Sequence, residues 1–161
     1  MMNKKTLLAK AVELYDNSLY LEAYELFYKI ISQNSECEEC YYYAGKCCEK
    51  MFYEYKAIEY YSKGIKKCSN CEHISDYHLD IGNCYIKLSK IDEAIFHYNE
   101  ASKFEANYLI AQFNKAKAFL CINDYNEALL IFEDLKRKNT HDLINNIKLD
   151  EYLQFCKNKK C

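Results

Sequence analysis

Residues 124–129 read Asp-Tyr-Asn-Glu-Ala-Leu, and residues 92–95 repeat part of this phrase as Asp-Glu-Ala-Ile. Apolar residues follow Ala128 at helical spacing, at positions 129, 131, 132 and 135. Phe132 comes four positions after Ala128, and a second small residue, Ala116, comes twelve positions before it. This order of small, small and aromatic residue decides the fold, because it recurs along the chain.

The pattern occurs four times. The first small residue recurs at spacings of 34, 37 and 34, at Ala11, Gly45, Gly82 and Ala116. An alanine follows each by twelve positions, at Ala23, Ala57, Ala94 and Ala128. An aromatic residue follows each alanine by four, at Phe27, Tyr61, Tyr98 and Phe132. Because two helices approach closely only where small side chains meet, we interpret each small pair as a helix crossing, with the aromatic ring filling the space beside it.

This pattern resembles the tetratricopeptide repeat (TPR), a helix-turn-helix unit of 34 residues. The resemblance predicts four repeats at 4–37, 38–71, 75–108 and 109–142, within a single domain over residues 1–161. It implies an all-α fold, a right-handed α-solenoid of antiparallel helix hairpins. The proline that the family often carries at the repeat end is replaced here by Ser35, Ser69, Ala106 and Thr140.

Two features concern how the repeats begin and end. Ser35 with Glu38, and Ser69 with Glu72, have the spacing of capping boxes that open the following repeat. A final helix is predicted over 141–157, where continuing the repeat places Asp150 at a position that is otherwise Ala or Gly. A carboxylate is tolerated there only if it faces water, as expected of a terminal solvating helix.

Composition supports the helical interpretation and excludes several classes of protein. The 161 residues include no proline and three glycines, half are apolar, and the formal net charge is −2. Scarce turn residues argue against a hairpin-rich β protein, and we expect all three glycines to lie at helix-packing sites. The charge balance argues against a nucleic-acid surface, and no apolar run is long enough for a membrane helix. We therefore predict a cytoplasmic helical protein.

In TPR proteins the first helices of successive repeats line a concave groove that holds a peptide or a partner helix. The resemblance places a mixture of lysines, amides and apolar residues in this groove. The predicted binding residues are Lys5, Leu8, Val12, Tyr42, Lys46, Leu79, Asn83, Lys87, Phe113, Asn114, Lys117 and Lys148. Tyr42 and Phe113 are candidate anchors for a partner side chain. The alternative is that these residues form an ordinary solvated helix face.

One subset of TPR proteins binds a C-terminal carboxylate through two lysines, two asparagines and a further basic residue. Asn83, Asn114 and Lys148 have spacings that fit the asparagines and the last basic position. The two lysine positions, however, are Leu79 and Ile144. Without those charges a carboxylate has little charge-assisted hydrogen bonding. A carboxylate clamp is therefore disfavoured.

Ten cysteines are a second unusual feature of the chain. Cys47 and Cys84 share one repeat position, and Cys48 lies where the other repeats have large apolar residues, so we expect all three to be core side chains. Two Cys-x-x-Cys pairs lie in equivalent turns of adjacent repeats, at Cys37, Cys40, Cys68 and Cys71. Their thiolates could hold a zinc ion or form a redox pair, although we expect unliganded thiols. The predicted cofactor content is therefore none.

No catalytic arrangement is apparent. His78 takes a packing position, and we expect His97 on the outer face of a second helix. No glycine-rich phosphate loop or ordered nucleophile set occurs. The sequence therefore predicts a non-enzymatic scaffold that binds a protein or peptide. The alternatives are a small metal-binding or thiol-sensing module and a piece that self-associates through its many tyrosines, as a homo-oligomer.

Overall fold

The computed structural model of the protein describes residues 4–33, 36–68, 73–138 and 146–159. Within these residues the chain forms nine α-helices and one short 3₁₀ helix, and no strand. Their bounds are α1 Lys4–Asp16, α2 Tyr20–Gln33, α3 Glu38–Lys50, α4 Glu54–Lys67, α5 Ile74–Lys87, α6 Ile91–Ala101, η2 Glu105–Asn107, α7 Tyr108–Cys121, α8 Tyr125–Arg137 and α9 Asn146–Lys159. The predicted all-α class is confirmed.

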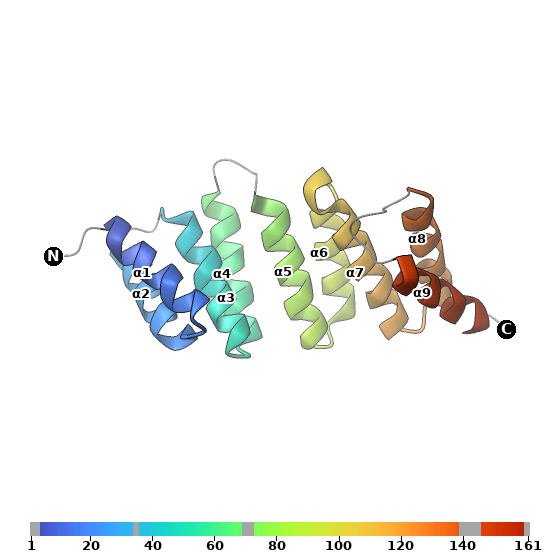
Figure 1. The fold of residues 1–161 in the computed structure, drawn as a ribbon, viewed down its shortest axis with the longest axis horizontal. Coiled ribbons are helices and arrows are strands. Elements are labelled where there is room, and N and C mark those ends of the chain that lie inside the picture. Colours follow the sequence, from blue (N-terminus) through green and yellow to red (C-terminus); the bar gives the residue numbers. More distant parts are fainter. Residues whose placement is uncertain (1–3, 34–35, 69–72, 139–145, 160–161) are drawn as a thin grey trace.

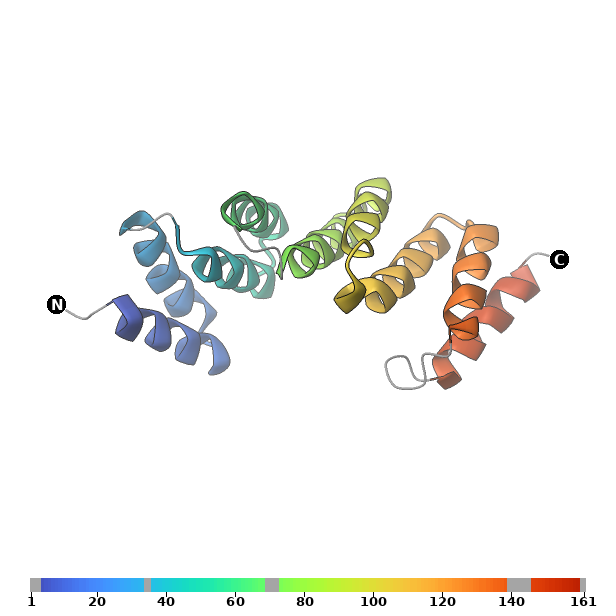
Figure 2. The same cartoon turned by 90° about the horizontal axis from the view of Figure 1, so that it is seen from above.

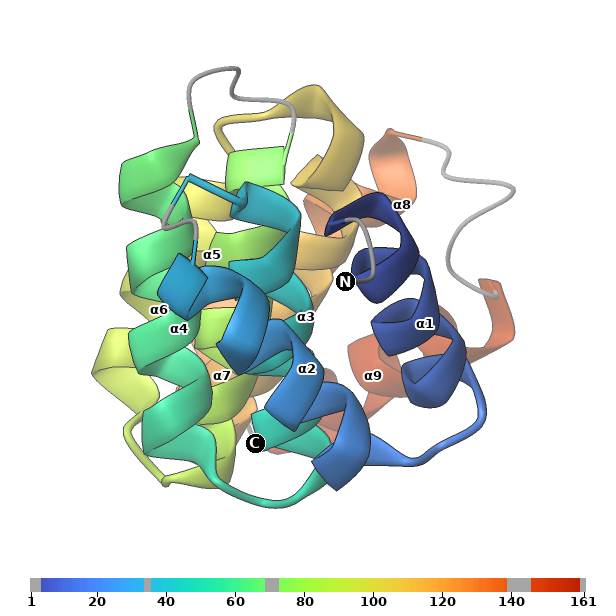
Figure 3. The ribbon, with the colours of Figure 1, turned by 90° about the vertical axis from the view of Figure 1, so that its left-hand side faces the viewer.

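Each helix packs against the one before and the one after it in the chain (Figure 1). Seen from above, the helices form an arch with two layers (Figure 2). The inner side of the arch carries α1, α3, α5 and α7, and the outer side carries α2, α4, α6 and α8. The view from the N-terminal end shows the hairpins stacked behind one another (Figure 3). The chain is thus a solenoid whose first helices share one concave face.

Small residues make the close contacts within the hairpins. All eight small residues of the repeat pattern are buried, at positions 11, 23, 45, 57, 82, 94, 116 and 128. A Cβ atom added to Gly82 would lie 2.6 Å from Cε1 of Tyr98, and one added to Gly45 would meet the ring of Tyr61. A Cβ atom added to Gly64 would lie 2.5 Å from Cε1 of Tyr77 in the next hairpin. The expectation that the glycines serve packing is confirmed.

The turn inside each hairpin holds one residue in the left-handed region. These residues are Ser18, Phe52, Ser89 and Asn123, with φ between 58° and 63°. Small polar residues tolerate this conformation far better than a bulky aromatic one. Phe52 is nevertheless 80% exposed, so it gains little burial in exchange. The second turn is therefore strained without a compensating contact.

We expect Phe52→Asn to raise the free energy of unfolding by about 1 kcal/mol, because asparagine adopts positive φ at lower cost. Urea denaturation followed by circular dichroism measures the change. The reciprocal variant Ser89→Phe introduces the same residue into the equivalent turn and is expected to destabilise the protein by a similar amount. A destabilised Phe52→Asn variant would contradict the assignment of strain.

The ends of two helices differ from expectation. α3 begins at Glu38 with Cys37 at its N-cap, so Glu38 is the first residue of this helix and not the third, as the predicted capping box requires. Ser35 of that box lies outside the described residues. The second such box, at Ser69 and Glu72, lies outside the described residues. The last helix extends to Lys159 rather than 157, and residues 141–145 of its predicted span lie outside the described residues.

The terminal helix packs on α8 and closes the array. Its buried side chains are Leu149, Leu153 and Cys156. Asp150 is exposed and accepts a hydrogen bond from Lys136 at 2.5 Å, as expected for a carboxylate that faces water. Among the described residues, no helix is both long and apolar enough to cross a membrane.

Candidate functional site

The concave face holds the predicted groove residues. Eleven of the twelve come from the inner helices α1, α3, α5 and α7, and the side chain of the twelfth, Lys148, lies outside the described residues. Lys5, Lys87 and Lys117 are exposed, and the other eight are half-buried. The helices bring them onto one surface with three depressions. Whether this surface binds a partner stays a prediction.

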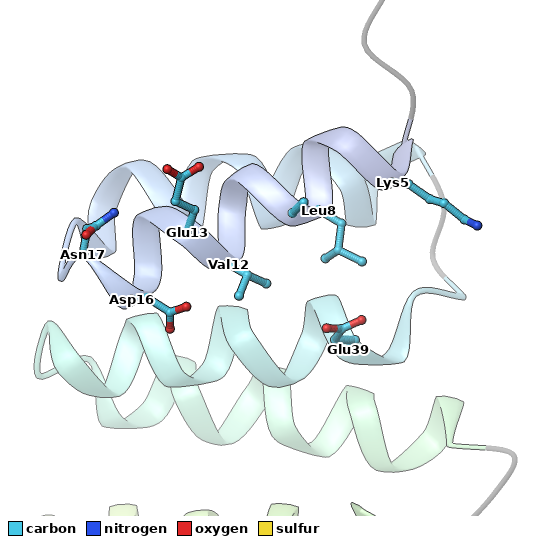
Figure 4. Close-up of a pocket in the computed structure, with 8 residues that line it drawn as sticks. Lys5, Leu8, Val12, Glu13, Asp16, Asn17 and Glu39 are labelled. Carbon is cyan, nitrogen blue, oxygen red and sulfur yellow. The ribbon is translucent and has the colours of Figure 1, made fainter.

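The first depression lies on α1 (Figure 4). Leu8 and Val12 supply its apolar part, with the carboxylates of Glu13, Asp16 and Glu39 around them. Its volume is about 650 Å³, and it is shallow and open to solvent. This end of the groove therefore combines an apolar floor with negative charge.

The second depression lies between the starts of α3 and α5. Its volume is about 530 Å³, and its lining residues are Glu38, Glu39, Tyr42, Tyr43, His73, Asp76 and Tyr77. The Tyr42 ring meets the rings of Tyr43 and Tyr77 edge-on, with centroids 5.8 Å and 5.5 Å apart. The hydroxyl of Tyr77 donates to the carbonyl of Glu38 at 3.1 Å. Rings and carboxylates thus share one small pocket, which we name the acidic pocket.

The field in and beside the acidic pocket is negative. The pKa of Tyr42 is raised well above its usual value by burial and then by the carboxylates of Asp80 and Asp76. The pKa of Tyr43 is raised in the same direction by burial, with contributions from Glu39 and Asp16. Negative charge on either ring is therefore disfavoured, and positive charge from a ligand would be favoured.

A partly buried charge network lies in the middle of the groove. Lys46 on α3 donates to both carboxylate oxygens of Asp80 on α5, at 3.2 Å and 3.1 Å. Glu49 accepts from Lys87 at 2.9 Å and from the Tyr61 hydroxyl at 3.1 Å. Lys46, predicted as a cation available to a partner, is therefore engaged within the fold.

The sequence interpretation overlooked Asp80, although a signal for it exists. Lys46 follows the small residue Gly45 by one position, and Asp80 precedes the next small residue, Gly82, by two. Asn83 and Asn114 stand in the same relation to Gly82 and Ala116, and they too are bonded, from Nδ2 of Asn114 to Oδ1 of Asn83 at 3.3 Å. Neighbouring inner helices are thus joined through one repeated pair of positions.

The third depression, which we name the amide–lysine pocket, lies between the second halves of α5 and α7. Its volume is about 550 Å³, and its polar lining comes from Glu49, Asn83, Lys87, Asn114 and Lys117, with Tyr152 of α9 at one side. Oδ1 of Asn83 also accepts from the Tyr98 hydroxyl at 2.9 Å. Because that oxygen already accepts two hydrogen bonds, the amide nitrogen of Asn83 is the group left for a ligand.

Phe113 was predicted as an anchor for a partner side chain. Its ring packs instead against Phe132 and Tyr152, with centroids 5.8 Å and 5.6 Å apart. The ammonium of Lys117 lies 5.8 Å from its ring centroid. Phe113 therefore joins α7 to α8 and α9, and contributes only part of its surface to the groove.

The expectation that His97 lies on the outer face is wrong. His97 on α6 is half-buried, and its Nδ1 lies 2.9 Å from Nδ1 of His78 on α5. One ring must donate and the other accept, so the contact requires both rings to be neutral or only one to be protonated. Burial, followed by the His78 charge, lowers the pKa of His97 to about 4, and burial also lowers the pKa of His78. This is a packing contact between helices.

We expect the free energy of unfolding to fall by about 2 kcal/mol between pH 7 and pH 4.5 because of this pair. The pKa of His97 is below its unfolded value, so the unfolded chain binds more protons between about pH 6.5 and pH 4, and stability is lost as the pH falls through that window. Denaturant titrations at a series of pH values measure the slope. His97→Gln should reduce it, and the exposed control His73→Gln should not.

The cysteines divide into two groups. Cys47, Cys48 and Cys84 are buried as expected, and burial raises the pKa of the Cys47 thiol to about 12, which makes it unreactive. Cys37 and Cys40 form a disulfide at the start of α3, so the expectation of unliganded thiols is wrong for this pair. Two of the four thiolates proposed for a zinc site are thus joined to each other, and Cys71 lies outside the described residues. The described residues contain no cluster of three or more metal-ligating side chains.

The arrangement can now be compared with known proteins. No family model and no curated protein sequence matches the chain. Solved structures do match. A crystal structure of MamA superposes with a TM-score of 0.77 at 21% identity, covering 84% of this chain and 78% of that one. The fold is that of the tetratricopeptide-repeat proteins.

Two further TPR structures show the same likeness. YrrB, described as a TPR protein with an unusual peptide-binding site, matches with a TM-score of 0.75 at 17% identity, covering 96% of this chain and 76% of that one. The C-terminal part of a TPR-containing protein from Cytophaga hutchinsonii matches with a TM-score of 0.81 at 19% identity, covering 95% and 58%. At these identities the TPR likeness establishes the architecture, and the role of the groove has to be argued from its own residues.

Proposed function

We propose that this TPR array is a non-catalytic scaffold that binds a peptide or a segment of a partner protein on its concave face. The observation that carries the proposal is the groove itself, where three depressions formed by the inner helices combine apolar, aromatic and charged side chains. Such mixed surfaces with amphipathic tyrosines suit protein recognition. The peptide-binding site named for YrrB, which shares the fold, supports the same role.

The absence of catalysis and a cytoplasmic location belong to this proposal. The half-buried histidine pair serves packing, and the thiols of Cys47 and Cys84 have pKa values raised to about 12 by burial, so neither provides a reactive group. The free, buried thiols of Cys47, Cys48 and Cys84 favour the reducing cytoplasm, where a disulfide such as Cys37–Cys40 is usually transient. We propose no nucleic-acid or membrane partner, because the groove carries carboxylates along its N-terminal half.

Selection of short random peptides tests the proposal. The full-length protein is expected to enrich peptides that no longer bind a variant with an altered groove. The variant Glu39→Lys/Lys117→Glu changes two exposed groove charges and leaves the net charge unchanged. Its matched control, Glu25→Lys/Lys66→Glu, makes the same exchange at exposed positions of the outer helices α2 and α4. Equal loss of binding in both variants, or no enrichment at all, would contradict a role for the groove.

A second candidate function, a thiol-sensing module, is supported by the disulfide at the start of α3. Glu38 and Glu39 of the acidic pocket lie between its two cysteines, and Tyr42 follows Cys40 by two positions. Peptide affinity measured before and after reduction, with the thiols counted by alkylation and mass spectrometry, tests it. Equal affinity in both states would exclude a sensing role. Metal analysis of protein purified without chelator tests the zinc alternative in the same samples.

A further inference from the structure

The charges of the groove are separated between its pockets. The described residues that line the acidic pocket include Glu38, Glu39 and Asp76, and neither lysine nor arginine. Asp76 accepts from Nδ2 of Asn107 at 2.5 Å and lies 3.4 Å from Nδ1 of His73, and no ion pair with a lysine or arginine engages it within the described residues. The rings of Tyr42, Tyr43 and the buried Tyr77 line the same pocket, and ring faces attract cations. The pocket therefore has the chemistry to hold an ammonium or guanidinium group.

The amide–lysine pocket has the opposite character. Lys87 and Lys117 face a single lining carboxylate, Glu49, which Lys87 already engages at 2.9 Å. Lys117 is exposed, with its ammonium near the Phe113 ring. The amide of Asn83 is held with its oxygen occupied, which leaves its nitrogen as a donor. Donors and positive charge thus dominate, and the pocket suits a carboxylate.

Helix α5 contributes residues to both pockets and therefore sets the distance between them. Asp76 lines the acidic pocket, and Asn83 and Lys87 line the amide–lysine pocket. These residues are separated by 7 and 11 positions, or about 10 to 16 Å at the helical rise of about 1.5 Å per residue. An extended peptide spans that distance in roughly three to five residues.

The charged side chains between the two pockets neutralise each other. Lys46 and Asp80 neutralise each other there through two hydrogen bonds. Leu79 is the half-buried apolar residue of this stretch of α5. Among the described residues, a ligand crossing the groove at this point therefore meets a lysine and an aspartate that already neutralise each other.

From this geometry we infer that the groove selects an extended polypeptide segment with a lysine or arginine and, about three to five residues away, an aspartate or glutamate. The cation occupies the acidic pocket and the carboxylate occupies the amide–lysine pocket, with neutral residues between them. This inference rests on the proposed peptide-binding function and specifies its ligand. A polyanion such as RNA fits less well, because it would place phosphates against Glu38, Glu39 and Asp76.

Fluorescence anisotropy with synthetic peptides and the full-length protein tests the inference. Two peptides carry one lysine and one glutamate at the derived spacing, in the two chain orders. Control peptides have the same composition with the charged residues adjacent, or have two lysines or two glutamates. At least one of the two spaced peptides is expected to bind about fivefold or more tightly than every control peptide.

Variants that replace one charged side chain of the groove with an uncharged amide then show which pocket binds each charged residue of the peptide. Glu39→Gln is expected to weaken binding of the spaced peptide and to have no effect once the peptide lysine is replaced by glutamine. Lys117→Gln should likewise weaken binding of the spaced peptide and have no effect once the peptide glutamate is replaced by glutamine. Glu25→Gln and Lys66→Gln on the outer helices are matched controls that leave affinity unchanged. All four positions are exposed, so folding is preserved.

The outcomes separate this inference from the proposed function. If random-peptide selection yields groove-dependent binders without a spaced charge pair, or if the two groove variants fail to discriminate between peptide ends, the charge-pair inference is wrong and the scaffold function stands. If neither selected nor designed peptides bind, both fail. Tighter binding of an RNA oligonucleotide than of any peptide would overturn the inference as well.

Discussion

Replacing Gly82 with alanine is expected to lower the free energy of unfolding by about 2–3 kcal/mol, although alanine is the better helix former by about 1 kcal/mol. The new Cβ atom would lie 2.6 Å and 2.8 Å from two carbons of the Tyr98 ring. That ring cannot move aside easily, because it is buried and its hydroxyl is bonded to Asn83. Chemical denaturation of the two proteins measures the loss.

The residue pairs in the four hairpins indicate a second substitution that should restore part of the stability of this variant. The two hairpins that carry glycine at this position carry tyrosine at the aromatic position, and the two that carry alanine carry phenylalanine. The double variant Gly82→Ala/Tyr98→Phe releases the ring from its hydrogen bond and is expected to regain part of the lost stability. If Gly82→Ala alone were as stable as the natural protein, the close packing of this crossing would be wrong.

The second large effect is expected at the buried ion pair. Lys46→Met leaves the Asp80 carboxylate, whose side chain is 11% exposed, without its cation and should cost about 3 kcal/mol. Burial already raises the pKa of Asp80, and Lys46 opposes that shift. The loss is read from denaturant titrations at neutral pH.

Two control variants separate the cost of an unpaired buried charge from the effect of losing any ion pair. Lys46→Met/Asp80→Leu removes both charges and should recover most of the stability, because an apolar pair can replace a buried ion pair at little cost. Lys63→Met removes an exposed pair with Glu59 and should change the free energy of unfolding by less than about 0.5 kcal/mol. If Lys46→Met and Lys63→Met had equally small effects, the pair of Lys46 and Asp80 would contribute no more to stability than an exposed ion pair.

Helix crossings were predictable because they depend on residue size at fixed spacing. Ala94 and Gly82 can be recognised as packing positions without coordinates, since a large side chain there would separate the helices. The face on which Asp150 lies was predictable for the same reason. The position of His97 was not predictable, because an imidazole ring can lie on the buried or on the exposed side of a helix. Its contact with His78 on the neighbouring helix places it on the buried side.

The groove was predictable as a surface and not as a site. Tyr42, Asn83 and Lys117 were correctly placed on inner helices by repeat register. Register says nothing of which charges neutralise each other, however, and Lys46 proved to be engaged by Asp80, 34 residues away. The negative and the positive pocket are defined by the charges that remain once internal pairs such as Lys46 and Asp80 have neutralised each other.

The sequence by itself determined the hairpin architecture, because small residues and aromatic rings at a period near 34 can bury their apolar surface in few other ways. The tertiary structure alone decided the chemistry of the concave face. Hydrogen bonds such as those from Lys46 to Asp80 and from Asn114 to Asn83 join helices of different hairpins. Their partners are set by three-dimensional packing, and they determine which polar groups remain for a ligand.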